Sequence, residues 1–151
     1  MRFWFGFIIQ YSEEIKDNAN LNFSNNFEEH HERLQSLVFE QLCELMITTY
    51  YKEKRTPIVE SGSFWDKINE FDLLAITKDK QVILGECKYS DRKICKKELN
   101  KLIHKAAQSN INPDVYILFS KSGFSNELLQ HQKDNPDTLL LFDISSLSII
   151  L

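Results

Sequence analysis

Two apolar runs dominate the middle of the sequence, EFDLLAI at residues 70–76 and QVILGECKY at residues 81–89, with the polar TKDK between them. Both runs are short and rich in aliphatic residues, so together they predict two β-strands joined in a hairpin. Both also carry charges, Asp72 in the first run and Glu86 and Lys88 at the end of the second. A strand that only filled a core would be apolar throughout, so these charges point to a function.

The alternation of side chains along a strand determines which of these charges can meet. Glu86 and Lys88 lie two residues apart and therefore share one face, whereas Cys87 points to the other face. A two-residue loop at Lys78 and Asp79 would set Asp72 opposite Gly85, on the wrong face. A shared site thus requires a turn of three residues or a bulge, and we predict such a turn.

Two carboxylates that converge on one point repel each other unless a positive charge lies between them. Magnesium prefers oxygen ligands and is often held by one or two carboxylates, so Asp72 and Glu86 predict a site for Mg²⁺ or Mn²⁺. The ammonium of Lys88 could orient a water molecule or offset charge on a phosphate. The alternative interpretation is a structural ion pair between Glu86 and Lys88 at the end of a strand, and the three residues alone leave both open.

The remaining pattern predicts an α/β fold. With 151 residues, of which 42% are hydrophobic, the chain can bury one substantial core. A long helix is predicted over residues 28–51, and shorter elements follow the hairpin: a helix at 96–108, a strand at 114–120, a helix at 125–132 and a strand at 138–144. With a weak strand candidate at 57–62, the order becomes αβββαβ, a mixed central sheet of about 4–5 strands flanked by helices. The inner face of the long helix is predicted to consist of Leu34, Leu37, Val38, Leu42, Leu45 and Met46, and that of the helix at 96–108 of Leu99, Leu102, Ile103 and Ala106.

Residues 1–26 are predicted to form a separate part. The opening RFWFGFI predicts an aromatic helix, and residues 17–26 contain five asparagines and predict a linker. The opening lacks a signal-peptide cleavage site, and no apolar run reaches the length that spans a bilayer, so we expect a cytoplasmic protein without a membrane partner. Aromatic residues so close to the start are compatible with a homodimer. The three cysteines show no zinc spacing.

A basic run follows the hairpin on a chain whose net charge is −4. Seven basic residues against two acids lie between Lys88 and Lys105. Phosphate contacts from such a run would hold a nucleic-acid backbone without reading its bases. The predicted nucleic-acid-binding residues are Lys93, Lys96, Lys97, Lys101 and Lys105. Three of them, Lys97, Lys101 and Lys105, are spaced by four residues and form one stripe along the predicted helix. The alternative is an ordinary solvated helix face.

The block GSFWDKINEFDLLAI…ILGECKY resembles two related groups of proteins. An acid on one strand and a Glu-x-Lys on the next resemble the PD-(D/E)xK nuclease superfamily. More closely, the block is similar to the domain of unknown function at the C-terminal end of archaeal and bacterial DEXX-box (AAA+-like) ATPases. That family shows Gly-x-Trp-Trp, Glu-Ile-Asp-x-x-Ala and Gly-Glu-Cys-Lys-Trp, and this chain keeps the charged positions with Phe64, Phe71 and Tyr89 as replacements. RFWFGFI and VFEQLCELM extend the resemblance over most of the chain.

The resemblance implies a function and a domain organisation. It implies a restriction-endonuclease-like core at residues 27–151 that cleaves DNA with Asp72, Glu86 and Lys88, with the helical acid Glu40 as a further catalytic carboxylate. The alternative for Glu40 is a solvated helix glutamate. The resemblance also implies that residues 1–26 are the remnant of a preceding winged-helix and ATPase part, which would be a partner in cis or in trans. Inactive members of the superfamily are common, so a catalytically inactive module for DNA binding or for docking to an ATPase is the second hypothesis.

Overall fold

The computed structural model describes residues 20–145, and the chain divides into two compact units, residues 1–39 and 40–151. In the first unit the described residues belong to the helix α3, which runs over Asn20–Glu53 and continues into the second unit. The prediction of a linker at residues 17–26 is therefore wrong for residues 20–26, which are helical, because local propensity is a weak guide to a long helix. The aromatic helix predicted at the start lies outside the described residues, and the domain boundary at residue 26 stays a prediction.

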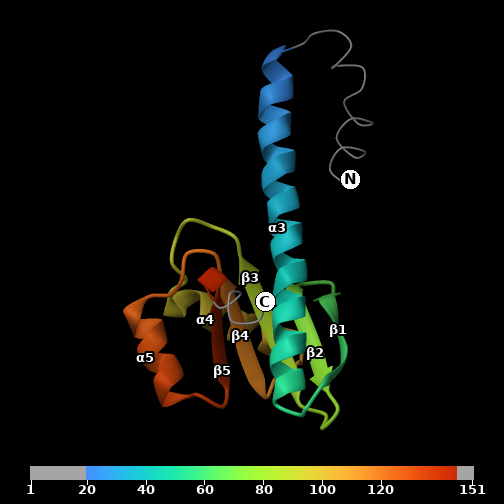
Figure 1. The fold of residues 1–151 in the computed structure, drawn as a ribbon, viewed down its shortest axis with the longest axis vertical. Coiled ribbons are helices and arrows are strands. Elements are labelled where there is room, and N and C mark those ends of the chain that lie inside the picture. Colours follow the sequence, from blue (N-terminus) through green and yellow to red (C-terminus); the bar gives the residue numbers. More distant parts are fainter. Residues whose placement is uncertain (1–19, 146–151) are drawn as a thin grey trace. The chain divides into compact units, whose positions relative to one another are not determined.

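The second unit contains one five-stranded mixed sheet in the order β1-β2-β3-β4-β5 (Figure 1). Its strands are β1 (Ile58–Trp65), β2 (Glu70–Thr77), β3 (Val82–Lys88), β4 (Val115–Ser120) and β5 (Leu139–Asp143), with the helices α4 (Lys96–Gln108) and α5 (Asn126–Asp134) between the last strands. The first three strands pair antiparallel, whereas β3, β4 and β5 pair parallel across their helical connections. The predicted order αβββαβ and the mixed α/β class are confirmed.

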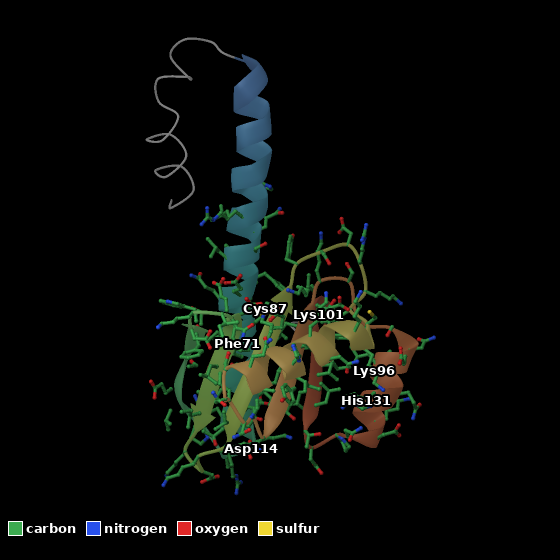
Figure 2. All side chains as sticks on the ribbon, turned by 180° about the vertical axis from the view of Figure 1, so that it is seen from behind. Phe71, Cys87, Lys96, Lys101, Asp114 and His131 are labelled. Atoms are coloured by element: carbon green, nitrogen blue, oxygen red, sulfur yellow. The ribbon has the colours of Figure 1, made fainter. Side chains whose placement is uncertain are left out.

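Helices cover both faces of this sheet. The segment 40–53 of α3 crosses the face seen in Figure 1, and α4 lies on the face seen from behind in Figure 2. Two residues in the first half of β3, Ile83 and Leu84, are 0% exposed although they point to opposite faces. This explains why the end of β3 is the place where charges can be reached: the rest of the strand is covered on both sides.

The buried faces of the helices differ in part from the predicted ones. In segment 40–53 the buried residues are Cys43, Met46, Ile47 and Tyr51, whereas Leu42 and Leu45 are 37% and 54% exposed. In α4, Leu99, Leu102 and Ala106 are buried as predicted, but Ile103 is 41% exposed. The long helix contains more apolar residues than one buried face needs, so spacing alone did not select the correct stripe.

The turn between β2 and β3 has three residues, as predicted. Val82 pairs with Ile76, and the amide of Thr77 donates to the carbonyl of Gln81, which leaves residues 78–80 as the loop. Lys80 closes the loop in the left-handed region at φ 66°, as is usual for the last residue of a three-residue hairpin loop. The register that results places Leu73 opposite Gly85, and this is the last pair of the ladder on the side of Asp72 and Glu86.

Candidate functional site

Asp72 lies at an irregularity of β2. Between the pairs Gly62–Leu74 and Phe64–Phe71, β1 advances by two residues and β2 by three, so β2 carries a bulge there. Beyond the last pair of the β2–β3 ladder, Oδ2 of Asp72 accepts a hydrogen bond of 2.7 Å from the amide of Cys87. Bulges turn side chains out of the regular alternation. The bulge and this hydrogen bond fix the carboxylate of Asp72 at the end of β3.

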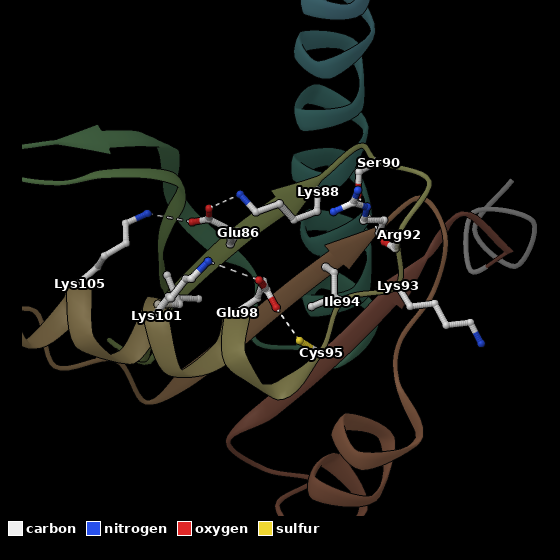
Figure 3. Close-up of a pocket in the computed structure, with 11 residues that line it drawn as sticks. Glu86, Lys88, Ser90, Arg92, Lys93, Ile94, Cys95, Glu98, Lys101 and Lys105 are labelled. Carbon is white, nitrogen blue, oxygen red and sulfur yellow. Dashed lines mark hydrogen bonds and ion pairs between the residues drawn. The ribbon is translucent and has the colours of Figure 1, made fainter.

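Glu86 and Lys88 meet on one face of β3, and a second lysine joins them. The ammonium of Lys88 lies 2.5 Å from Oε1 of Glu86, and the ammonium of Lys105 lies 3.1 Å from Oε2 (Figure 3). The Glu86 side chain is only 15% exposed. The ion pair between Glu86 and Lys88, which was one of the two interpretations of the sequence, is therefore present, and it forms part of a three-residue cluster with α4.

Cys87 points to the opposite face, as the alternation predicts. Its thiol lies beside that of Cys43 on α3, and the hydrogen bond between them, with burial, raises the pKa of Cys87. An uncharged thiol fits this face because it is packed against the helix. The pattern Glu-Cys-Lys thus places the two charged side chains on the face of the sheet that α4 covers and the thiol on the face that α3 covers.

The carboxylates of Asp72 and Glu40 are both less acidic than usual. Burial raises the pKa of Asp72; the hydrogen bond from Cys87 opposes this, and the negative charge of Glu86 adds to it. Burial also raises the pKa of Glu40, and the charges of Asp72 and Glu70 raise it further. The structure therefore brings Glu40 from α3 into the electrostatic field of the strand carboxylates, which a helix glutamate in open solvent would not feel.

Lys88 is held in its charged form. Burial would lower its pKa, but the hydrogen bond and the charge of Glu86, together with the charge of Asp72, more than compensate, so the pKa of Lys88 is raised. A lysine in this state is a donor of hydrogen bonds and a fixed positive charge rather than a base.

The carboxylate oxygens of these acids are ligands of the kind that a hard divalent cation such as Mg²⁺ prefers. Oδ1 of Asp72 and the carboxylate of Glu40 have no hydrogen bond or ion pair with the described residues, and repulsion among the acids disfavours their charged forms. Within residues 20–145, no group of three or more His, Cys, Asp or Glu side chains is arranged to hold a metal ion. Mg²⁺ is often held by only one or two carboxylates, with water completing its shell.

A basic cavity of about 520 Å³ adjoins these residues (Figure 3). Its lining begins at Glu86 and Lys88, continues through the loop after β3 with Ser90 and Arg92, and ends on α4 at Lys105. Of its cations, Arg92 and Lys93 form no ion pair with the described residues, whereas Lys101 lies 3.5 Å from Glu98. The cavity thus carries uncompensated positive charge next to the acids.

The predicted nucleic-acid-binding lysines separate into three groups. Lys93 and Lys101 line the cavity. Lys96 and Lys97 lie in the first turn of α4 outside the cavity lining. Lys105 is turned inward onto Glu86, so the predicted stripe of Lys97, Lys101 and Lys105 is not one uniform solvated face.

Two residues of this region were not predicted in their observed roles. Arg92 belongs to the basic run but was not selected as a ligand, and only its place in the cavity distinguishes it. The contact of Lys105 with Glu86 joins residues 19 positions apart, on a helix and a strand. Its spacing resembles that of any solvated lysine, so the sequence carries no local signal for it.

The similarity to solved structures is weak, and no curated protein matches the chain. A protein of unknown function, AF1548, superposes with a TM-score of 0.44 at 16% identity, over 66% of this chain and 55% of that chain. A repair endonuclease from Pyrococcus abyssi superposes with a TM-score of 0.41 at 12% identity, over 66% of this chain and 45% of that chain. The chain thus spans about half of each structure.

The family comparison is more specific. Residues 4–102 match the model of a family named DUF234 and described as "Archaea bacterial proteins of unknown function". The match includes Glu40, Asp72, Glu86 and Lys88, and covers more than half of the chain. No helix in the part of the chain that the structure describes is long and apolar enough to cross a membrane. By this match over β1, β2, β3 and the start of α4, the chain belongs to the DUF234 family of archaeal and bacterial proteins of unknown function.

Proposed function

We propose that the protein is a metal-dependent nuclease that hydrolyses phosphodiesters in DNA. The observation that carries the proposal is the end of β3, where Oδ2 of Asp72 accepts a hydrogen bond from the amide of Cys87, the residue between Glu86 and Lys88. Glu86 and Lys88 share one face there and line a basic cavity. In this proposal Asp72 and Glu86 hold Mg²⁺ or Mn²⁺, which supplies Lewis acidity and a more acidic bound water.

The roles of the remaining side chains follow from their charges. The ammonium of Lys88 orients the attacking water and offsets the charge that develops on the phosphate. Glu40, whose pKa is raised by burial and by neighbouring acids, assists as an additional carboxylate. The cations of the adjoining cavity and of α4 hold the DNA backbone through its phosphates, without selecting a base sequence.

A metal-dependence assay tests this proposal. We expect the purified protein to cleave DNA with Mg²⁺ or Mn²⁺ and to stop in the presence of a chelator. Asp72→Ala and Glu86→Ala should each abolish cleavage and also the metal binding seen by calorimetry. Glu60→Ala is the matched control, because Glu60 is an exposed acid on the neighbouring strand β1. Cleavage that survives both substitutions, or metal binding that neither removes, would refute the assignment.

The second candidate is an inactive module that binds DNA or docks to an ATPase and winged-helix part, in cis or in trans. The contacts of Glu86 favour it, because both of its carboxylate oxygens already meet an ammonium group. If the protein binds DNA in the presence of a chelator as well as in the presence of Mn²⁺, and never cleaves it, the second candidate is the correct one.

A further inference from the structure

The carboxylate of Glu86 carries one cation on each oxygen. Lys88 lies at Oε1 and Lys105 at Oε2, at 2.5 Å and 3.1 Å. A divalent ion shared with Asp72 would use an oxygen of Glu86 and would lie within a few ångström of one of these ammonium groups. Like charges at such a distance repel strongly in a half-buried site. Binding of the ion therefore requires that one lysine move.

The two lysines differ in how closely they are held by Glu86. Lys88 lies 2.5 Å from Oε1, whereas Lys105 lies 3.1 Å from Oε2, although the side chain of Lys88 is the more exposed of the two, at 41% against 28%. Lys105 reaches Glu86 from another element, the helix α4. Its ammonium also lies 5.1 Å from the centroid of the Phe71 ring. An aromatic face stabilises a cation, so Lys105 has a second favourable contact besides Glu86 in its present position.

We propose that Lys105 occupies Glu86 as an exchangeable cation, which a divalent metal displaces toward the basic cavity, where its ammonium binds a phosphate of the DNA. The proposal rests on the proposed function and adds a positioning residue that couples metal to substrate. Lys105 contacts the carboxylate of Glu86 and also lines the cavity. A movement of this one side chain would therefore transfer its positive charge from Glu86 to the cavity in which we propose that the DNA phosphate binds.

The exchange predicts that metal and DNA bind cooperatively. The metal releases a cation that the DNA phosphate needs, and the phosphate in turn holds away the cation that competes with the metal. Such coupling is reciprocal by thermodynamic necessity. Direct attraction between metal and phosphate adds to it, so the contribution of Lys105 has to be isolated with a variant.

Lys105→Gln and Lys101→Gln form a matched pair for this purpose. Both lysines lie on α4 and line the cavity, one turn apart, but Lys101 pairs with Glu98 and not with Glu86. Calorimetric titration with Ca²⁺ or Mn²⁺, with and without a short DNA duplex, measures metal affinity at a stage before cleavage. Each substitution removes one positive charge from α4. The general effect of that charge on metal affinity is therefore the same in both variants, and their difference reports the contact of Lys105 with Glu86.

For the wild type we expect metal binding to be tighter by roughly fivefold or more when DNA is present. Lys105→Gln should bind metal more tightly than Lys101→Gln in the absence of DNA, and DNA should improve its metal binding less. Lys105→Arg keeps the cation and should restore weak metal binding without DNA. Equal metal affinities of the two glutamine variants would overturn the role of Lys105 while leaving the proposed function intact. A wild type that binds no metal would overturn both.

Discussion

Asp72 is a residue whose position costs stability. Burial and the charge of Glu86 raise its pKa, so its charged form is less favourable in the folded protein than in the unfolded chain. Between the ordinary pKa of an aspartate and the raised one, the folded state binds more protons than the unfolded state. The free energy of unfolding should therefore fall as the pH rises through this interval, and the full penalty remains at neutral pH. Urea titrations of the metal-free protein at several pH values between about 3 and 7 measure this slope.

Asp72→Asn removes the charge and keeps an oxygen that can accept from the amide of Cys87. We expect the free energy of unfolding of this variant at neutral pH to exceed that of the wild type by roughly 0.5–2 kcal/mol, a gain typical of single stabilising substitutions. The variant should therefore unfold at a higher urea concentration. It should also lose metal binding. Asp114→Asn is the comparison, because Asp114 also accepts from a backbone amide, that of Val82, but at an exposed position. A less stable Asp72→Asn variant would show that the carboxylate is structural.

At the scale of elements, close packing of β3 against β2 leaves little room beside Gly85. A Cβ atom there would come within 3.1 Å of Cβ of Leu73, which is only 2% exposed, so Leu73 would have to shift by a few tenths of an ångström inside the core. We expect Gly85→Ala to destabilise the protein by about 1–3 kcal/mol, as for other overpacked positions. A Cβ at Gly62 in β1 would meet nothing within 4 Å. Gly62→Ala should therefore be close to neutral in chemical denaturation, and equal losses in both variants would refute the packing argument.

The turn between β2 and β3 sets the register of the site, and Lys80 adopts a left-handed backbone there at φ 66°. A non-glycine residue pays about 1–2 kcal/mol in this conformation. Lys80→Gly should therefore stabilise the protein by up to about 1 kcal/mol, after the entropic cost of glycine is included. Lys78→Gly, at a loop residue without a positive φ, should destabilise it instead. Thermal unfolding of both variants measures the difference, and a loss of stability in Lys80→Gly would contradict it.

These elements also show what the sequence could and could not predict. The period of two along β3 and the length of the turn follow from local chemistry, so the faces of Glu86 and Cys87 and the three-residue loop were predicted correctly. The bulge at Asp72 depends on pairing with β1, which no local pattern encodes. The buried stripe of α3 and the inward turn of Lys105 depend on where helices pack against the sheet. Tertiary contacts decided these features, and spacing within one element did not.

At the scale of the whole molecule, charge is distributed unevenly. The chain carries a net charge of −4, yet the loop after β3 and α4 collect basic residues around one cavity. An acidic protein repels DNA in general, so if the protein binds DNA as proposed, we expect binding through this local region and a decrease of affinity with salt. The number of phosphates it contacts can be obtained from the slope of affinity against salt concentration.

Charge reversal at Lys97 and Lys101 tests this region. We expect the double variant Lys97→Glu, Lys101→Glu to bind DNA more weakly at low salt and to show a flatter salt dependence, with the slope reduced by about 1 for each lost phosphate contact. Lys133→Glu on α5 makes a lysine outside the cavity lining acidic and changes the net charge in the same direction. Its slope should remain that of the wild type. If Lys133→Glu flattens the slope as much per charge, the binding reflects net charge, and the predicted solvated face of α4 would be the correct interpretation.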